Sequence, residues 1–126
     1  MVKPSDITTA INSRITAEFP GYTVYIQRCP EDFVRPSFLL EYVSISRRDA
    51  NRSTIEKTVN FKITCFEIID ENYQSDPDRL TGLQEAVLEL FSCGYVPVND
   101  RAIKVQSSTG GMDPDRAYVD LQFQYF

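Results

Sequence analysis

Three arginines close together are the residues of this sequence whose type and spacing are hardest to explain by structure alone. Arg47, Arg48 and Arg52 are three of the 13 basic residues, although the chain as a whole has a net charge of -5. Guanidinium groups suit carboxylates and phosphates because their donors form a planar fork. The segment is either a solvated loop or a projecting arm that contacts an anion or an acidic partner surface.

Catalytic chemistry has few candidates in this chain. The sequence contains no histidine, which excludes Ser-His-Asp and Cys-His catalysis and imidazole zinc sites within it. None of Lys3, Lys57, Lys62 and Lys104 has a recognised spacing from a serine nucleophile. There is also no P-loop and no dinucleotide fingerprint. We therefore predict that the chain is not an enzyme and binds no cofactor.

Paired carboxylates occur at two prolines. Asp76 and Asp78 flank Pro77, and Asp113 and Asp115 flank Pro114. Such pairs can bind metals or transfer protons. Aspartate is also favoured at turns and helix caps, where its side chain accepts backbone hydrogen bonds. We interpret both pairs as structural and expect no metal site.

Composition places the chain among ordinary soluble proteins. Its 126 residues predict one domain, residues 1–126. A pI of about 4.7 argues against a dedicated duplex-binding module. Cys29, Cys65 and Cys93 are odd in number and widely spaced, which predicts reduced thiols. No apolar region follows Lys3 and no apolar run could span a membrane, so we expect folding in the cytoplasm and no membrane contact.

Two segments have the spacing of amphipathic helices. Residues 5–19 carry apolar side chains at every fourth position, namely Ile7, Ile11, Ile15 and Phe19. Ser5 or Asp6 can cap this helix, and Pro20 ends it. A second helix is predicted from Pro77 to Phe91, with Asp76 as its cap and Gly94 just after its end.

Alternating apolar and polar residues predict strands over 22–28, 37–46, 54–68, 101–107 and 116–126. The strands 37–46 and 54–68 are expected to form a long antiparallel hairpin that projects beyond the domain body, with 47–53 as its loop. Residues 95–98 are extended, but the pattern leaves their pairing open. Residues 108–115 are predicted to form a flexible turn.

These elements predict an α+β fold in the order α-β-β-β-α-β-β. Two helices would pack on one face of a mostly antiparallel sheet, from which the long β-hairpin projects.

The order of elements, together with one short phrase, resembles the tail terminator proteins of long-tailed bacteriophages and of prophages in Gram-positive bacteria. The resemblance runs over nearly the whole chain. The matching segments are Glu18-Phe19-Pro20, Val24-Tyr25, the phrase Phe33-Val34-Arg35-Pro36-Ser37-Phe38, Leu40-Glu41, residues 59–63, Leu80 to Phe91 and residues 119–123.

The resemblance implies a structural virion protein without catalytic residues. Such proteins form a ring, commonly of six subunits, on the head-proximal end of the tail tube. The ring ends tube polymerisation and presents the surface for head attachment. The implied partners are further copies of the chain, the tail tube protein and a head-completion or connector protein. DNA would pass through the lumen without sequence-specific binding.

The size of the chain is compatible with this role. A globule of this length is about 35 Å across, and six such discs leave a central opening of about 35 Å. Arg47, Arg48 and Arg52 are then candidates for contact with another subunit or with the tube. Two alternatives stay open, namely another head-tail connector or neck component, and a small cytosolic binding module of the host.

Overall fold

The computed structural model describes residues 3–28, 30–31, 33–49, 55–70, 74–92, 94–98 and 101–125, with the side chain of residue 109 left aside. In chain order the elements are α1 (Pro4–Glu18), β1 (Thr23–Ile26), β2 (Ser37–Asp49), β3 (Ile55–Phe66), α2 (Pro77–Leu90), β4 (Tyr95–Val98), β5 (Arg101–Asp113) and β6 (Arg116–Tyr125).

Both helices begin and end close to the predicted positions. The N-cap of α1 is Lys3, and not Ser5 or Asp6 as predicted, because Pro4 takes the first helical position. Asp6 lies in the first turn, where its side chain accepts a hydrogen bond from the backbone N–H of Lys3 at 2.8 Å. In α2 the Asp76 side chain caps the helix by accepting from the N–H of Asp78 at 3.1 Å. The signals were local in sequence, and they fixed the boundaries to within about a residue.

One six-stranded sheet holds all the strands, in the order β1-β2-β3-β6-β5-β4. The four central strands β2, β3, β6 and β5 are antiparallel to their neighbours. At one edge β1 pairs with β2 in parallel, but only over residues 37–40. At the other edge β4 pairs with β5 in antiparallel, over residues 101–104.

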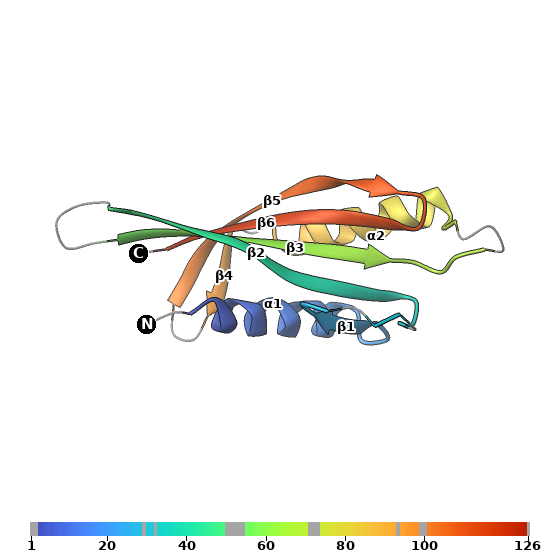
Figure 1. The fold of residues 1–126 in the computed structure, drawn as a ribbon, viewed down its shortest axis with the longest axis horizontal. Helices are drawn as coiled ribbons and strands as arrows, with labels where there is room; N and C mark the ends of the chain where they lie inside the picture. The colour runs from blue at the N-terminus through green and yellow to red at the C-terminus, as the bar shows by residue number, and fades with distance from the viewer. Residues whose placement is uncertain are drawn as a thin grey trace.

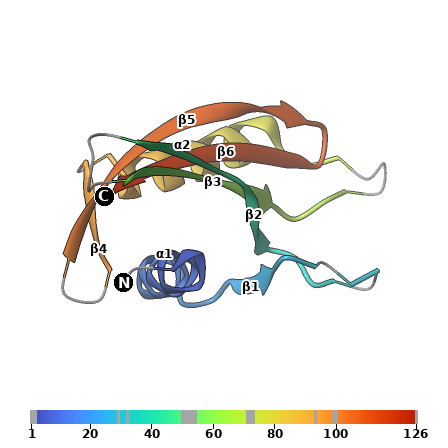
Figure 2. The ribbon, with the colours of Figure 1, turned by 60° about the vertical axis from the view of Figure 1, so that its left-hand side comes forward.

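The sheet curls around α1, so that the core lies in its hollow. In Figure 2, α1 is seen nearly end-on, with β4 on one side of it and β1 on the other. The isoleucines of α1 join one buried cluster with Leu80, Leu83 and Val87 of α2 and with alternate residues of the strands. The face that carries this cluster is called the inward face below, and the opposite face is the outward face.

The predicted fold class was wrong in its proportion of helix to strand and in the number of strands after the second helix. The strands contain roughly twice as many residues as the helices, so the chain is mainly β. Three strands follow α2, not two. The additional strand is β4, whose Val96 and Val98 are buried and whose Tyr95 pairs with Lys104. Pro97 is compatible with this assignment because β4 lies at the sheet edge.

The predicted turn at 108–115 was also wrong, because most of these residues belong to β5. The register of β5 against β6 shifts between Thr109 and Gly111, which is a β-bulge. A Cβ atom at Gly110 would lie 2.7 Å from Asp120 Oδ2 and 3.0 Å from Tyr118 Cβ. Gly110 therefore permits a close approach between strands, and Gly111 adopts a positive φ of 109° at the bulge. The turn itself is confined to Pro114 and Asp115.

The β2–β3 hairpin extends past the rest of the molecule, as Figure 1 shows at its left. Both strands are longer than the usual five or six residues. The pairing continues to Asp49 opposite Ile55. Arg47 and Arg48 therefore lie in a strand and not in the predicted loop, and Arg52 lies outside the described residues.

Candidate functional site

The distal part of the β2–β3 hairpin places Arg47 and Arg48 on opposite faces of the sheet. Arg48 lies on the outward face, and its Nη2 is 3.0 Å from Glu56 Oε2 on the opposite strand. Its side chain is 78% exposed, so this ion pair stabilises the hairpin by no more than about 1 kcal/mol.

Arg47 lies on the inward face, where its cross-strand neighbour is another cation. It is paired in register with Lys57, and Lys57 in turn with Tyr125 of β6. Lys57 Nζ is 5.9 Å from the centroid of the Tyr125 ring. Two like charges directly opposite each other in a sheet are destabilising. The structure thus divides the predicted basic cluster and adds Lys57, which the sequence pattern did not single out.

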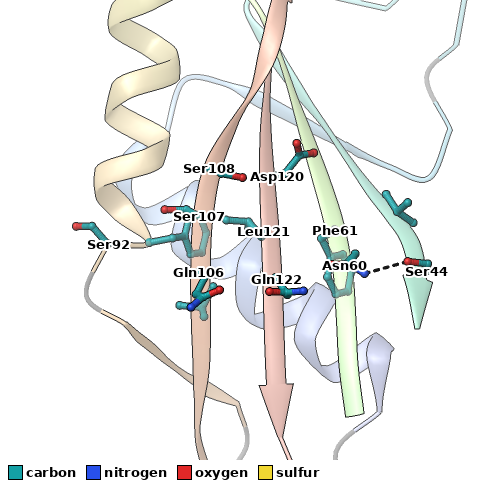
Figure 3. Close-up of a pocket in the computed structure, with 13 residues that line it drawn as sticks. Ser44, Asn60, Phe61, Ser92, Gln106, Ser107, Ser108, Asp120, Leu121 and Gln122 are labelled. Carbon is teal, nitrogen blue, oxygen red and sulfur yellow. Dashed lines mark hydrogen bonds between the residues drawn. The ribbon is translucent and has the colours of Figure 1, made fainter. Parts of the chain in front are cut away.

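The outward face of the four central strands is polar. One row across the sheet consists of Ser44, Asn60, Gln122 and Gln106, which are successive register partners. Asn60 Nδ2 donates to Ser44 Oγ at 3.0 Å, the dashed line in Figure 3. The next row toward the far end consists of Glu41, Lys62, Asp120 and Ser108.

A shallow hollow of about 800 Å³ lies along these rows and reaches the end of α2 at Phe91 and Ser92. Figure 3 shows serine, asparagine and glutamine side chains around it. Asp120 is the only charged side chain among the described residues that line it. Most of the described side chains that line it are hydroxyls, amides and apolar groups, so the hollow offers mainly hydrogen-bonding groups.

Arg35 forms a junction at the end of the sheet away from the hairpin. Its Nη1 donates to the backbone oxygens of Glu67 at 3.0 Å and Asp115 at 2.9 Å. Its Nη2 donates to Asp115 Oδ2 at 2.9 Å. The guanidinium carbon also lies 4.9 Å from the ring centroid of Phe33 and 5.2 Å from that of Phe66. One side chain thus joins the segment before β2, the segment after β3 and the β5–β6 turn.

The Arg35 junction gives a structural role to one of the predicted carboxylate pairs. Asp115 accepts hydrogen bonds from Arg116 and Arg35, and these bonds hold its pKa below its usual value although partial burial opposes them. Asp113 accepts from the hydroxyl of Tyr118 at 2.6 Å. No group of three cysteine or acidic side chains comes together as metal ligands would in the described part of the chain.

Of the three cysteines, Cys65 is described and is buried on the inward face. Burial raises the pKa of its thiol to about 12, so the thiol is neutral and unreactive at neutral pH. Cys29 and Cys93 lie outside the described residues.

Comparison with known proteins decides the family. A family model described as phage tail terminator protein matches residues 6–125. The chain belongs to the phage tail terminator family. This is a family of structural virion proteins of the phage tail, as the sequence resemblance implied.

The fold is also similar to that of a solved structure. That structure is titled only with a sequence identifier, and the match has a TM-score of 0.59 and 15% identity over 100% of this chain and 99% of that chain. No curated protein matches the terminator. Among the described helices none is long and apolar enough to cross a membrane.

Proposed function

We propose that six copies of this terminator form a ring on the head-proximal end of the tail tube. The ring ends tube polymerisation and provides the surface to which the head, through its completion or connector protein, attaches. The family match over residues 6–125 carries this proposal. Arg47, Arg48 and Arg52 of the hairpin are candidates for subunit or tube contact.

Two incompletely paired strand edges support ring formation. On β2, β1 covers residues 37–40, and no described strand pairs with the same edge from Val43 to Asp49. On β5, β4 covers residues 101–104, and no described strand pairs with that edge from Gln106 onward. Two different edges per copy are what a closed ring of identical subunits requires.

The strand directions are compatible with this contact. Three successive antiparallel pairings make β5 run opposite to β2. In a ring whose copies all point the same way, the open edge of β2 therefore meets the open edge of the neighbour's β5 in antiparallel orientation. The contact between copies would then have the same antiparallel hydrogen-bond pattern as the central strands within each copy.

The offset between the two edges supports a tilted arrangement. Ser46, near the middle of the open part of β2, is level with Lys104, whereas the open part of β5 is centred near residues 109 and 110. This offset of five to six residues is about 18 Å along the strands, and four strands are about 19 Å wide. Full pairing then tilts the strands by about 43°, which is ordinary for a closed sheet.

The same arithmetic supports a ring wide enough for duplex DNA. Six copies of four strands, spaced by about 4.8 Å and tilted as above, give a perimeter of about 160 Å and a diameter of about 50 Å. The outward face, with its amide and hydroxyl rows, suits the lumen because it would not grip phosphates as a basic surface does.

Deleting the gene from its phage or prophage tests the proposed function. We expect tails of uncontrolled length that do not join to heads, and normal tails when the gene is supplied in trans. Electron microscopy of tails and of purified protein measures length, joining and rings. Joined tails of normal length after deletion would refute the proposal. Tails of normal length that fail to join would favour a connector or neck component instead.

A further inference from the structure

The inward face of the hairpin is electrostatically incomplete. Arg47 and Lys57 are direct cross-strand partners. Asp49, opposite Ile55, is a carboxylate on the same face, but no ion pair within 4 Å joins it or another described carboxylate of the hairpin to Arg47 or Lys57, whereas Arg48 on the outward face is paired with Glu56. Repulsion between Arg47 and Lys57 is relieved when an acidic group from another molecule lies over them.

The same face also carries exposed apolar groups. Ile45 and Ile55 lie two register positions on either side of the Arg47–Lys57 pair, on the same face, and are 39% and 38% exposed. Apolar groups beside a cation pair suit a protein surface better than a phosphate backbone, which offers no apolar partner. The patch formed by Ile45, Arg47, Ile55 and Lys57 is called the hairpin patch below.

Helix α2 offers the matching chemistry on its exposed side. Asp78, Glu85 and Glu89 are exposed and lie roughly opposite the buried Val87, because successive residues turn by about 100° around a helix. Leu88 lies on the side of α2 next to β5, because its carbonyl accepts a hydrogen bond from Ser107 Oγ at 3.4 Å. Glu85 lies about 60° from Leu88 toward solvent.

Ring geometry brings these two surfaces together. A neighbour's β2 placed on the open edge of β5 has its inward face on the same side of the sheet as α2, since α2 packs on the inward faces of β5, β6 and β3. Within one copy, the hairpin and α2 lie toward opposite ends of the molecule (Figure 1). The contact is therefore possible only between copies.

We propose that in the ring the hairpin patch of each copy packs against α2 of the next copy, with Arg47 and Lys57 facing Glu85 and Glu89. This inference rests on the proposed ring, and it names the second copy as the occupant of the hairpin patch. Partly buried ion pairs of this kind set the register and direction of an interface.

Charge reversal tests the contact. We expect R47E/K57E to reduce the fraction of protein in rings about tenfold, E85K/E89K to do the same, and the fourfold variant, which has the parent's net charge, to recover most of it. Light scattering after gel filtration and electron microscopy measure the rings, and tail length in a complementation assay measures them in place. K3E/R28E is the matched control, because it makes the same charge change at exposed positions outside both the hairpin and α2.

Three results would overturn the inference and leave the proposed ring intact. One is normal rings from R47E/K57E with defective tails, which would assign the patch to the tube. Another is normal rings from R47E/K57E with faster DNA exit, which would assign the patch to phosphate. The third is that R47E/K57E loses rings, although circular dichroism shows it to be folded, and that adding E85K/E89K to it does not restore them.

Crosslinking gives an independent readout. Carbodiimide treatment of rings assembled from mixed ¹⁴N and ¹⁵N protein should join Lys57 to Glu85 or Glu89 in peptides that contain both isotopes. Intact rings that yield no such mixed peptide would contradict the contact. Absence of rings or tails under every condition would instead count against the proposed function.

Discussion

At the scale of single residues, Arg35 determines more of the structure than its sequence context indicates. Pro36 directly precedes β2, where a proline costs no ladder hydrogen bond, so the geometry at the start of a strand accounts for Pro36 but not for the arginine beside it. In the structure the guanidinium satisfies two backbone carbonyls and one carboxylate and lies against two aromatic rings. Its partners come from distant segments, so no pattern in the neighbouring sequence could reveal them.

The carboxylate of this junction should make stability depend on pH. Hydrogen bonds from Arg116 and Arg35 lower the pKa of Asp115 in the folded state. Its contribution is therefore fully present above the unfolded pKa of about 3.9 and is lost as pH falls through the lower folded pKa. We expect Asp115→Asn to cost about 1.5–3 kcal/mol at pH 7, and this difference from the parent to shrink below pH 4.

Urea unfolding at pH 7, 5 and 3 measures this difference. Glu18→Gln is the control, because Glu18 is exposed and has no ion-pair partner among the described residues. Its difference from the parent should stay nearly constant over this range. A difference for Asp115→Asn that is equally constant would show that Asp115 does not gain its stability from the charged form.

At the scale of elements, local signals predicted the helices well and the strand ends poorly. The periodic apolar positions of α1 and α2 and the Asp and Pro residues at their starts depend only on nearby residues. The extension of β2 through Arg47 and Arg48 depends instead on pairing with β3, and the parallel pairing of β1 depends on the distant β2. For this reason the division of the arginines between two faces could not be predicted before the register was known.

Substitutions at Gly110 and Gly82 test whether β5 continues through a bulge, where a strand depends on its distant neighbour. At Gly110 a Cβ atom would meet Asp120 Oδ2 and Tyr118 Cβ, whereas at Gly82, inside α2, nothing lies within 4 Å. We expect Gly110→Ala to lower the free energy of unfolding by about 1–3 kcal/mol. Gly82→Ala should raise it by about 0.5–1 kcal/mol, because alanine favours the helix. Chemical denaturation measures both, and equal effects would show that Gly110 belongs to a turn and not to a bulge.

At the scale of the whole molecule, the curled sheet and both helices share one core. Phe61 lies near its centre, with its ring edge-to-face against Tyr42 and Phe123, both at 5.7 Å between centroids. Such a core couples α1, which contacts β2 and β4, to α2, which contacts β3, β5 and β6. Cooperative unfolding follows from this sharing of buried neighbours.

Truncation of Phe61 tests the shared core. We expect Phe61→Ala to lower the free energy of unfolding by about 3–5 kcal/mol, with one midpoint for helix loss and for tyrosine fluorescence. Circular dichroism at 222 nm and the emission of the seven tyrosines report these two events. Two separate midpoints would mean that one helix detaches while the remaining core survives.

The staggered open edges also protect the chain before it reaches a tail. Suppose that the β2 edge of one molecule meets the β5 edge of another without any offset along the strands. The open part of β2 then faces the part of β5 that β4 covers, and the open part of β5 faces the part of β2 that β1 covers. Indefinite lateral growth into fibrils is thereby disfavoured. Molecules that meet level therefore do not extend one another's sheets, while the tilted pairing of the proposed ring stays possible.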